Sequence, residues 1–233
     1  IEDDISANEA LDTIQGELYK ISTNSATSEL KDMQTVTSDT LAYIEKMKKL
    51  GNKYLIGQTT GFEALDKKTT GFNEGDLVII AARPAMGKTA LVLNMALKNV
   101  ERGKGVIFFS LEMPAEQLML RMLAAKTSIP LQNLRKGDMD DKEWSNLSAA
   151  FDDLNSKKLF VDDGGSININ QLRARVRKLA QIQENNISLV IIDYLQLMQG
   201  LGNKDRHQEV SDISRGLKML ARELKIPIVA LSQ

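Results

Sequence analysis

The residues that could do chemistry in this sequence gather first in a short loop, 82–89, which reads ARPAMGKT. A P-loop has the pattern G-x-x-x-x-G-K-[ST], and here alanine occupies the first glycine position while the last three positions match. An apolar run precedes the loop and a helical pattern follows it, so loop N–H groups and a helix N-terminus would face bound phosphates. Lys88 would then neutralise the β- and γ-phosphates, and the Thr89 hydroxyl would bind Mg²⁺. The expected phosphate contacts are Ala82, Arg83, Pro84, Ala85, Met86, Gly87, Lys88 and Thr89.

Two carboxylates follow other apolar runs and could complete such a site. Asp193 ends the run LVIID, and Glu112 lies two residues beyond the run VIFFS. In a parallel sheet the carboxyl ends of the strands share one edge, so both acids would lie beside the loop. Asp193 would hold Mg²⁺ through water, the alternative being a strand-ending turn. Glu112 is the best candidate for a general base, and the alternative is that it only favours the N-terminus of the helix that opens at Pro114.

The amino-acid composition limits the kinds of metal site and cross-link that the chain can form. The chain has 233 residues with no cysteine and a single histidine, His207, so thiolate-ligated zinc, disulfides and histidine clusters are excluded. Any metal is therefore expected to be held by oxygen ligands, which suits Mg²⁺. No uncharged apolar run of membrane-spanning length occurs, and the acidic first residues, IEDDISANEA, do not form a secretory signal. We expect a cytoplasmic protein that does not bind membranes.

The elements that must position these residues alternate along residues 53–233. Strands are expected at 76–82, 105–110, 159–163, 188–193 and 226–233, and helices at 90–100, 114–126, around Trp144, at 170–183 and at 208–225. This alternation predicts an α/β fold with a mostly parallel sheet that is covered by helices on both faces.

Residues 1–52 have a different character and are expected to form a separate helical linker region. They contain an apolar stripe at 8–21, a polar stretch, and a second helix at about 38–50 with Ser38 and Gly51 as its caps. Residues 1–50 carry a net charge of −5, whereas the remainder carries +4, which permits nucleic-acid binding without requiring it. Neither helix has a core of its own, so each must pack on the main domain or on another chain.

Several separate stretches, in order, resemble the motor domain of bacterial hexameric replicative DNA helicases of the DnaB type. They are TTGFEALDKKTTGFNEGDLVIIAARPAMGKTA, FFSLEM, IIDYLQLM and QEVSDISRGLKMLARELKIPIVALSQ, and the resemblance runs from about Ile56 to Gln233 with gaps around 126–160. It implies a RecA-like P-loop NTPase that binds ATP and Mg²⁺ between neighbouring subunits of a six-membered ring. It also implies movement along single-stranded DNA and 5′-to-3′ unwinding at the replication fork. A protein with this activity is expected to associate with the nucleoid.

The resemblance assigns roles residue by residue. Lys88 and Thr89 become the phosphate and Mg²⁺ contacts, Glu112 the catalytic glutamate, and Asp193 the carboxylate on the Mg²⁺ side. Gln233, by itself only a polar strand end, becomes a γ-phosphate sensor. Arg121 matches an arginine of the family, with a structural ion pair as an equal alternative.

The resemblance also makes the helix near 38–50 similar to the linker helix that docks on the neighbouring subunit, with packing inside one chain as the alternative. In the family the chain continues beyond this point, so the arginine finger and a main DNA-binding loop are expected after residue 233. Because such a finger contributes about 10³–10⁵ in rate, the segment alone is expected to hydrolyse ATP weakly.

Partners and alternatives complete the expectations. Primase and a helicase loader are implied by the family, and Lys204 and Arg206 in the loop 199–209 are candidate DNA-phosphate contacts, a solvated surface loop being the alternative. Two other functions remain open from the sequence. One is a different RecA-like ATPase, such as a recombinase or ring ATPase, and the other is a non-catalytic scaffold for primase or loader.

Overall fold

A computed structural model describes residues 31–49, 55–199 and 206–232 of the chain. The chain divides into two compact units, Ile1–Lys53 and Tyr54–Gln233. The apolar stripe predicted at 8–21 lies outside the described residues. Within the ranges that are described, no helix is both long enough and apolar enough to span a membrane.

The first unit contains one described helix, α2 (Met33–Lys49), which begins before the predicted start at Ser38. The reason is local, because the side chain of Asp32 accepts a hydrogen bond from the Thr35 N–H at 2.8 Å and so satisfies a donor of the first turn. Thr37 and Thr40 are accommodated inside the helix because each hydroxyl donates to the carbonyl four residues earlier.

The second unit is built on a five-stranded parallel sheet, as the sequence predicts. Its spatial order is β1-β5-β4-β2-β3, so the loop-bearing first strand lies beside the last one. The strands are β1 (Leu77–Ala81), β2 (Gly105–Ser110), β3 (Leu159–Asp162), β4 (Ile187–Asp193) and β5 (Ile228–Ser232).

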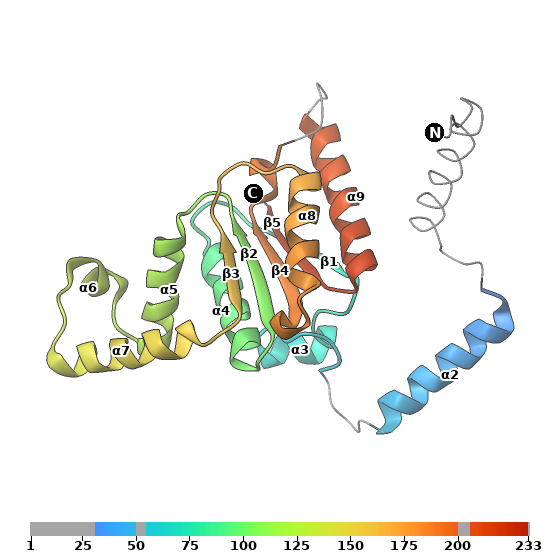
Figure 1. The fold of residues 1–233 in the computed structure, drawn as a ribbon, viewed down its shortest axis with the longest axis horizontal. Helices are drawn as coiled ribbons and strands as arrows, with labels where there is room; N and C mark the ends of the chain where they lie inside the picture. Colours follow the sequence, from blue (N-terminus) through green and yellow to red (C-terminus); the bar gives the residue numbers. More distant parts are fainter. Residues whose placement is uncertain (1–30, 50–54, 200–205, 233) are drawn as a thin grey trace, which may run out of the picture. The chain divides into compact units, whose positions relative to one another are not determined.

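Helices cover both faces of this sheet (Figure 1). The principal ones are α4 (Lys88–Glu101), α5 (Ala115–Thr127), α7 (Asp141–Asn155), α8 (Ile169–Ala180) and α9 (Arg206–Leu224). Shorter elements are α3 (Glu63–Thr69), α6 (Leu131–Lys136), η1 (Gln183–Asn185) and η2 (Leu195–Leu197). One apolar cluster joins α4, α5 and α7 to the sheet, and a second joins α8 and α9 to its opposite face.

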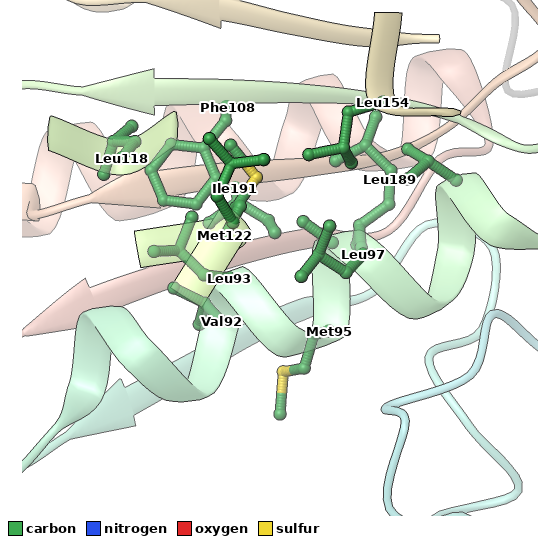
Figure 2. Packing of buried hydrophobic residues seen from close by; sticks show 14 of the residues in the cluster. Val92, Leu93, Met95, Leu97, Phe108, Leu118, Met122, Leu154, Leu189 and Ile191 are labelled. Carbon is green, nitrogen blue, oxygen red and sulfur yellow. The ribbon is translucent and has the colours of Figure 1, made fainter. Parts of the chain in front are cut away.

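The helix that follows the loop 82–89, α4, is anchored in the first of these clusters. Side chains of α4 pack against β2, β4 and α5, as Figure 2 shows for Leu93, Phe108, Met122 and Ile191. Each fully buried side chain of this size contributes about 1.5–3 kcal/mol relative to an exposed one. The start of α4, and hence the loop before it, is therefore held in place by the core.

A buried polar network fixes the other end of α4. Asp66, which is 3% exposed, accepts hydrogen bonds from the hydroxyl of Thr59 (2.5 Å) and from the hydroxyl (2.6 Å) and N–H (2.7 Å) of Thr60. The Asn99 amide of α4 donates to the Thr59 carbonyl oxygen at 2.8 Å. This network ties the segment that precedes β1 to the last turns of α4.

Candidate functional site

The candidate site lies at the edge where the parallel strands end. Ser110 of β2 is paired in register with Asp193 of β4, and Ala81 of β1 with Ser232 of β5. The Leu111 N–H continues this pattern by donating to the Asp193 carbonyl oxygen at 2.8 Å. Strand pairing therefore gathers residues from four distant parts of the sequence at one edge, as expected for the ligand edge of an open α/β sheet.

The loop between β1 and α4 has the backbone conformation of an anion cradle. Gly87 has φ 86° and Ala85 has φ 62°, so the chain turns sharply through the left-handed region before α4 begins. Gly87 is also the N-cap of α4, and no side chain caps the helix there. The first N–H groups of α4 and the positive end of its dipole are therefore left to an anion.

Lys88 lies at the junction of loop and helix. Its ammonium group donates to the carbonyl oxygens of Ala82 (2.6 Å) and Arg83 (3.3 Å), so it closes the loop onto its own first residues. Arg83, Pro84, Ala85, Met86 and Gly87 are all exposed around it. The arrangement leaves a positive charge beside accessible main-chain groups, which is what a polyphosphate needs.

Thr89 and Asp193 meet across 104 positions of sequence. The Thr89 hydroxyl donates to a carboxylate oxygen of Asp193 at 2.7 Å. Asp193 is 3% exposed, and this burial raises the pKa of its carboxyl above the ordinary value. The nearby Glu112 carboxylate acts in the same direction on that pKa, while the hydrogen bond from Thr89 opposes it.

Glu112 lies just beyond β2, at the same edge, and its side chain is exposed. Among the described residues it forms no hydrogen bond or ion pair. The role of supporting the N-terminus of α5 is taken instead by Asp163, whose carboxylate accepts a hydrogen bond from the Ala115 N–H at 2.9 Å. Glu112 therefore remains close to Asp193 with its carboxylate uncommitted.

Arg121, in α5, is close enough to Asp193 to influence its carboxyl group. Its positive charge lowers the pKa of Asp193, in opposition to burial. The Nε atom of Arg121 is buried without a hydrogen-bond partner, and the described residues include no ion pair of this side chain. The structure thus gives no support to a purely structural ion pair and places an unsatisfied donor beside the site.

The remaining predicted site residues are placed only in part. Gln233 and Lys204 lie outside the described residues. Arg206 is the first residue of α9, where its guanidinium group donates to Glu209 Oε2 at 2.7 Å and to the main-chain oxygen of Gln196.

The side chains at this edge fit a magnesium–nucleotide pair better than a metal bound by protein alone. In the described ranges no group of three or more acidic or histidine side chains is placed to hold a metal ion. The hydroxyl of Thr89 and the carboxylate of Asp193 are nevertheless oxygen donors beside a cationic loop. Mg²⁺ is commonly bound in this way, by one or two protein oxygens together with substrate phosphates and water.

Two structural contacts at this edge were not predicted from the sequence. Asp163 caps α5 from the end of β3, and Gln196 of η2 donates to the hydroxyl of Ser232 at 2.8 Å. For the contact of Asp163 with α5, the only signal in the sequence is the pair of acids, Asp162 and Asp163, at the end of the third strand. No local pattern signals the second, because its partners are brought together by the pairing of β4 with β5.

The sheet order, the glycine–lysine–threonine loop and the acid at the end of β4 define a P-loop nucleotide-binding domain of the RecA-like class. Residues 57–233 match the family described as DnaB-like helicase C terminal domain, and the chain belongs to this family.

Curated relatives and solved structures agree with that assignment. The chain is 43% identical over 228 residues to the replicative DNA helicase DnaB of Helicobacter pylori, covering 97% of this chain and 46% of that protein. It is 44% identical over 230 residues to the replicative DNA helicase DnaC of Bacillus subtilis, covering 97% and 49%. The chain thus spans about half the length of the curated relatives it matches.

Two solved structures share the fold. One, described as an ATPase domain, superposes with a TM-score of 0.78 at 31% identity, covering 84% of this chain and 70% of that one. The other is a DnaB-like replicative helicase described with its interactions with primase. Its TM-score is 0.76 at 30% identity, covering 97% of this chain and 53% of that one.

Proposed function

We propose that this chain is the ATP-hydrolysing motor of a replicative DNA helicase, which moves along single-stranded DNA and unwinds the duplex at a replication fork. The observation that carries the proposal is the contact between Thr89 and Asp193, at 2.7 Å. It brings the last residue of the P-loop pattern to the acid that ends β4, at the edge where an uncapped helix and Lys88 favour phosphate. The family of the chain supplies the link from ATP to DNA unwinding.

In the proposed reaction the loop residues bind and orient the phosphates. The Lys88 ammonium group exchanges its two loop carbonyls for β- and γ-phosphate oxygens, and the N–H groups at the start of α4 complete the cradle. When bound, Mg²⁺ would be held by Thr89, by Asp193 through water and by the phosphates, and would neutralise charge that develops on them.

Glu112 is proposed to orient the attacking water and to accept its proton. Its exposed carboxylate, with no partner among the described residues, is available for this work. Arg121 is proposed to hold its unpaired Nε–H toward the acidic groups of the site. Gln233 is proposed to contact the γ-phosphate from the end of β5.

The proposal extends to partners. A ring of six copies would place each nucleotide between neighbours, with α2 docking on the next subunit, and the apolar residues exposed on α2, such as Leu41 and Ile44, support a docking role. Single-stranded DNA would be contacted without base specificity, with Lys204 and Arg206 as candidates. Primase, as for the structural neighbour described above, and a helicase loader are the proposed protein partners at forks in the cytoplasm.

Unwinding of a forked duplex with a 5′ single-stranded tail tests the proposal, using protein from the complete open reading frame. We expect ATP-dependent unwinding, and a loss of about 10²–10³ in ATP hydrolysis when Lys88→Ala removes the main cation of the site. Lys98→Ala is the matched control, since Lys98 lies on the same helix and pairs with Glu101 at 3.0 Å on the surface. Unwinding that survives Lys88→Ala would overturn the proposal.

A further inference from the structure

Between the acid at the end of β4 and the start of α9 lies the short helix η2, which is firmly anchored. Leu195 and Met198, on either side of Gln196, are buried in the apolar cluster beneath α8 and α9. Gln196 therefore occupies a defined position only three residues after Asp193. The function described above gives it no role.

The side chain of Gln196 contacts the end of β5. Its Nε2 donates to the Ser232 hydroxyl at 2.8 Å. Ser232 is paired with Ala81, and its carbonyl oxygen accepts a hydrogen bond from the Ala82 N–H at 3.4 Å. The strand end that Gln196 holds is thus bonded to the first residue of the P-loop, and it immediately precedes Gln233.

The main chain of Gln196 contacts a different element. Its carbonyl oxygen accepts a hydrogen bond from the guanidinium group of Arg206, the first residue of α9, which also bonds Glu209 at 2.7 Å. One residue therefore joins the end of β5 to the first turn of α9. Hydrogen bonds weaken steeply as their distance and angle change. A small shift of the end of β5 would therefore change the contacts of Gln196 with α9, and a shift of α9 would change those with β5.

We infer that Gln196 is a positioning residue that couples the phosphate end of β5 to the start of α9, so that nucleotide state and DNA engagement influence each other. The inference rests on the proposed function. When the end of β5 responds to the γ-phosphate, the Ser232–Gln196 bond carries the displacement to Arg206. Coupling is reciprocal, so DNA that engages beside α9 would alter the nucleotide site through the same contacts.

The test measures ATP hydrolysis with and without single-stranded DNA, for the protein expressed from the complete open reading frame. Gln196→Ala is expected to keep the hydrolysis rate without DNA, and the KM for ATP, within about twofold of wild type. Stimulation by DNA is expected to fall by about fivefold or more, the lower end of common coupling factors. Gln181→Ala is the matched control, because this glutamine is exposed and lies at the C-cap of α8, outside the loop 199–209.

A double-mutant cycle separates coupling from a general loss of structure. Ser232→Ala is expected to reduce DNA stimulation to the same extent as Gln196→Ala, and the double variant is expected to lose no more than either one. Gln196→Glu, which keeps the length and can accept the Ser232 hydroxyl, is expected to restore part of the stimulation.

Three outcomes would overturn the inference. One is full DNA stimulation in Gln196→Ala, another is additive losses in the cycle, and the third is an equal loss of hydrolysis with and without DNA. A wild-type protein that neither hydrolyses ATP nor unwinds DNA would instead refute the proposed function, so the two failures are distinguishable.

Discussion

Two aspartates, each 3% exposed, lie near opposite ends of helix α4 and have different surroundings. Asp66, beside the last turns of the helix, receives three hydrogen bonds from Thr59 and Thr60. Within the part of the chain that the structure describes, the Asp193 carboxylate, beside the first turn, receives one side-chain hydrogen bond, from Thr89, and burial raises its pKa. The two carboxylates are therefore equally buried, but Asp66 accepts more hydrogen bonds than Asp193.

The difference separates a structural carboxylate from a candidate functional one. A buried charge that is fully hydrogen-bonded stabilises the fold, but a buried charge with spare lone pairs costs free energy until a ligand satisfies it. We propose that Mg²⁺ and water supply the missing partners of Asp193. On this proposal, the free protein loses some stability at Asp193 that ligand binding restores.

Removal of the satisfied carboxylate should have the largest effect on stability. Asp66→Ala leaves the Thr59 hydroxyl and the Thr60 N–H without their acceptor, and leaves the Thr60 hydroxyl only the Phe62 carbonyl oxygen at 3.2 Å. We therefore expect the free energy of unfolding to fall by about 3 kcal/mol. The corresponding fall in melting temperature is about 6–12 °C for a unit of this size. Urea unfolding measures the change, with exposed Asp152→Ala as the control. A loss below about 0.5 kcal/mol, typical of surface substitutions, would contradict this assignment.

Removal of the charge at Asp193 should have the opposite sign. Asp193→Asn keeps an acceptor for the Thr89 hydroxyl and removes the buried charge, so the free energy of unfolding should rise by about 1 kcal/mol. ATP hydrolysis should fall by about 10–100-fold, because the carboxylate is proposed to support the metal ion through water. Chemical denaturation and a steady-state ATPase assay, made on the same variant, test both halves. If Asp193→Asn is less stable than wild type and fully active, Asp193 is a structural carboxylate like Asp66, and the proposed difference between them is wrong.

The pH dependence of stability sharpens the same contrast. Because the pKa of Asp193 is raised in the folded protein, the stability due to its protonated form is fully present below the ordinary value of 3.8. That stability is lost as pH rises through the raised pKa. The advantage of Asp193→Asn over wild type should therefore be largest near neutral pH and shrink as pH is lowered through that pKa. Urea midpoints over a pH series would show this, and a gap independent of pH would contradict it.

The smallest expected effect belongs to an ionic cluster near the surface. Lys126 of α5 lies 2.8 Å from Asp153 of α7 and 3.6 Å from Glu101 of α4, and the hydrogen bond to Asp153 contributes most to raising the pKa of Lys126. Because all three groups are partly exposed, Lys126→Met should cost no more than about 1 kcal/mol. Thermal unfolding at low and high salt measures this loss of stability. A loss as large as that of Asp66→Ala would show that the stability of these groups depends less on burial than on ion pairing.

Much of the fold follows from local pattern. The predicted strand at 105–110 coincides with β2, because a short continuous apolar run is typical of a buried strand. The predicted helix at 208–225 differs from α9 by only a few residues, because its apolar side chains recur at helical spacing. The predicted start of α2 is too late, since Ser38 resembles an N-cap whereas Asp32 provides the cap. The loop 82–89 can be proposed as a phosphate site from the sequence because its residue types and spacing match the P-loop pattern, and this assignment stays a prediction.

The sequence by itself determined the succession of elements, the cationic loop and the acids that could serve it, because these depend on residues close together in the chain. Only the tertiary structure decided which acid the Thr89 hydroxyl meets, that Asp163 rather than Glu112 caps α5, and that Gln196 joins β5 to α9. Each of these contacts depends on strand order and register, which place residues far apart in sequence at the same edge of the sheet. Hydrogen bonds depend on tenths of an ångström, and local spacing carries no information at that scale.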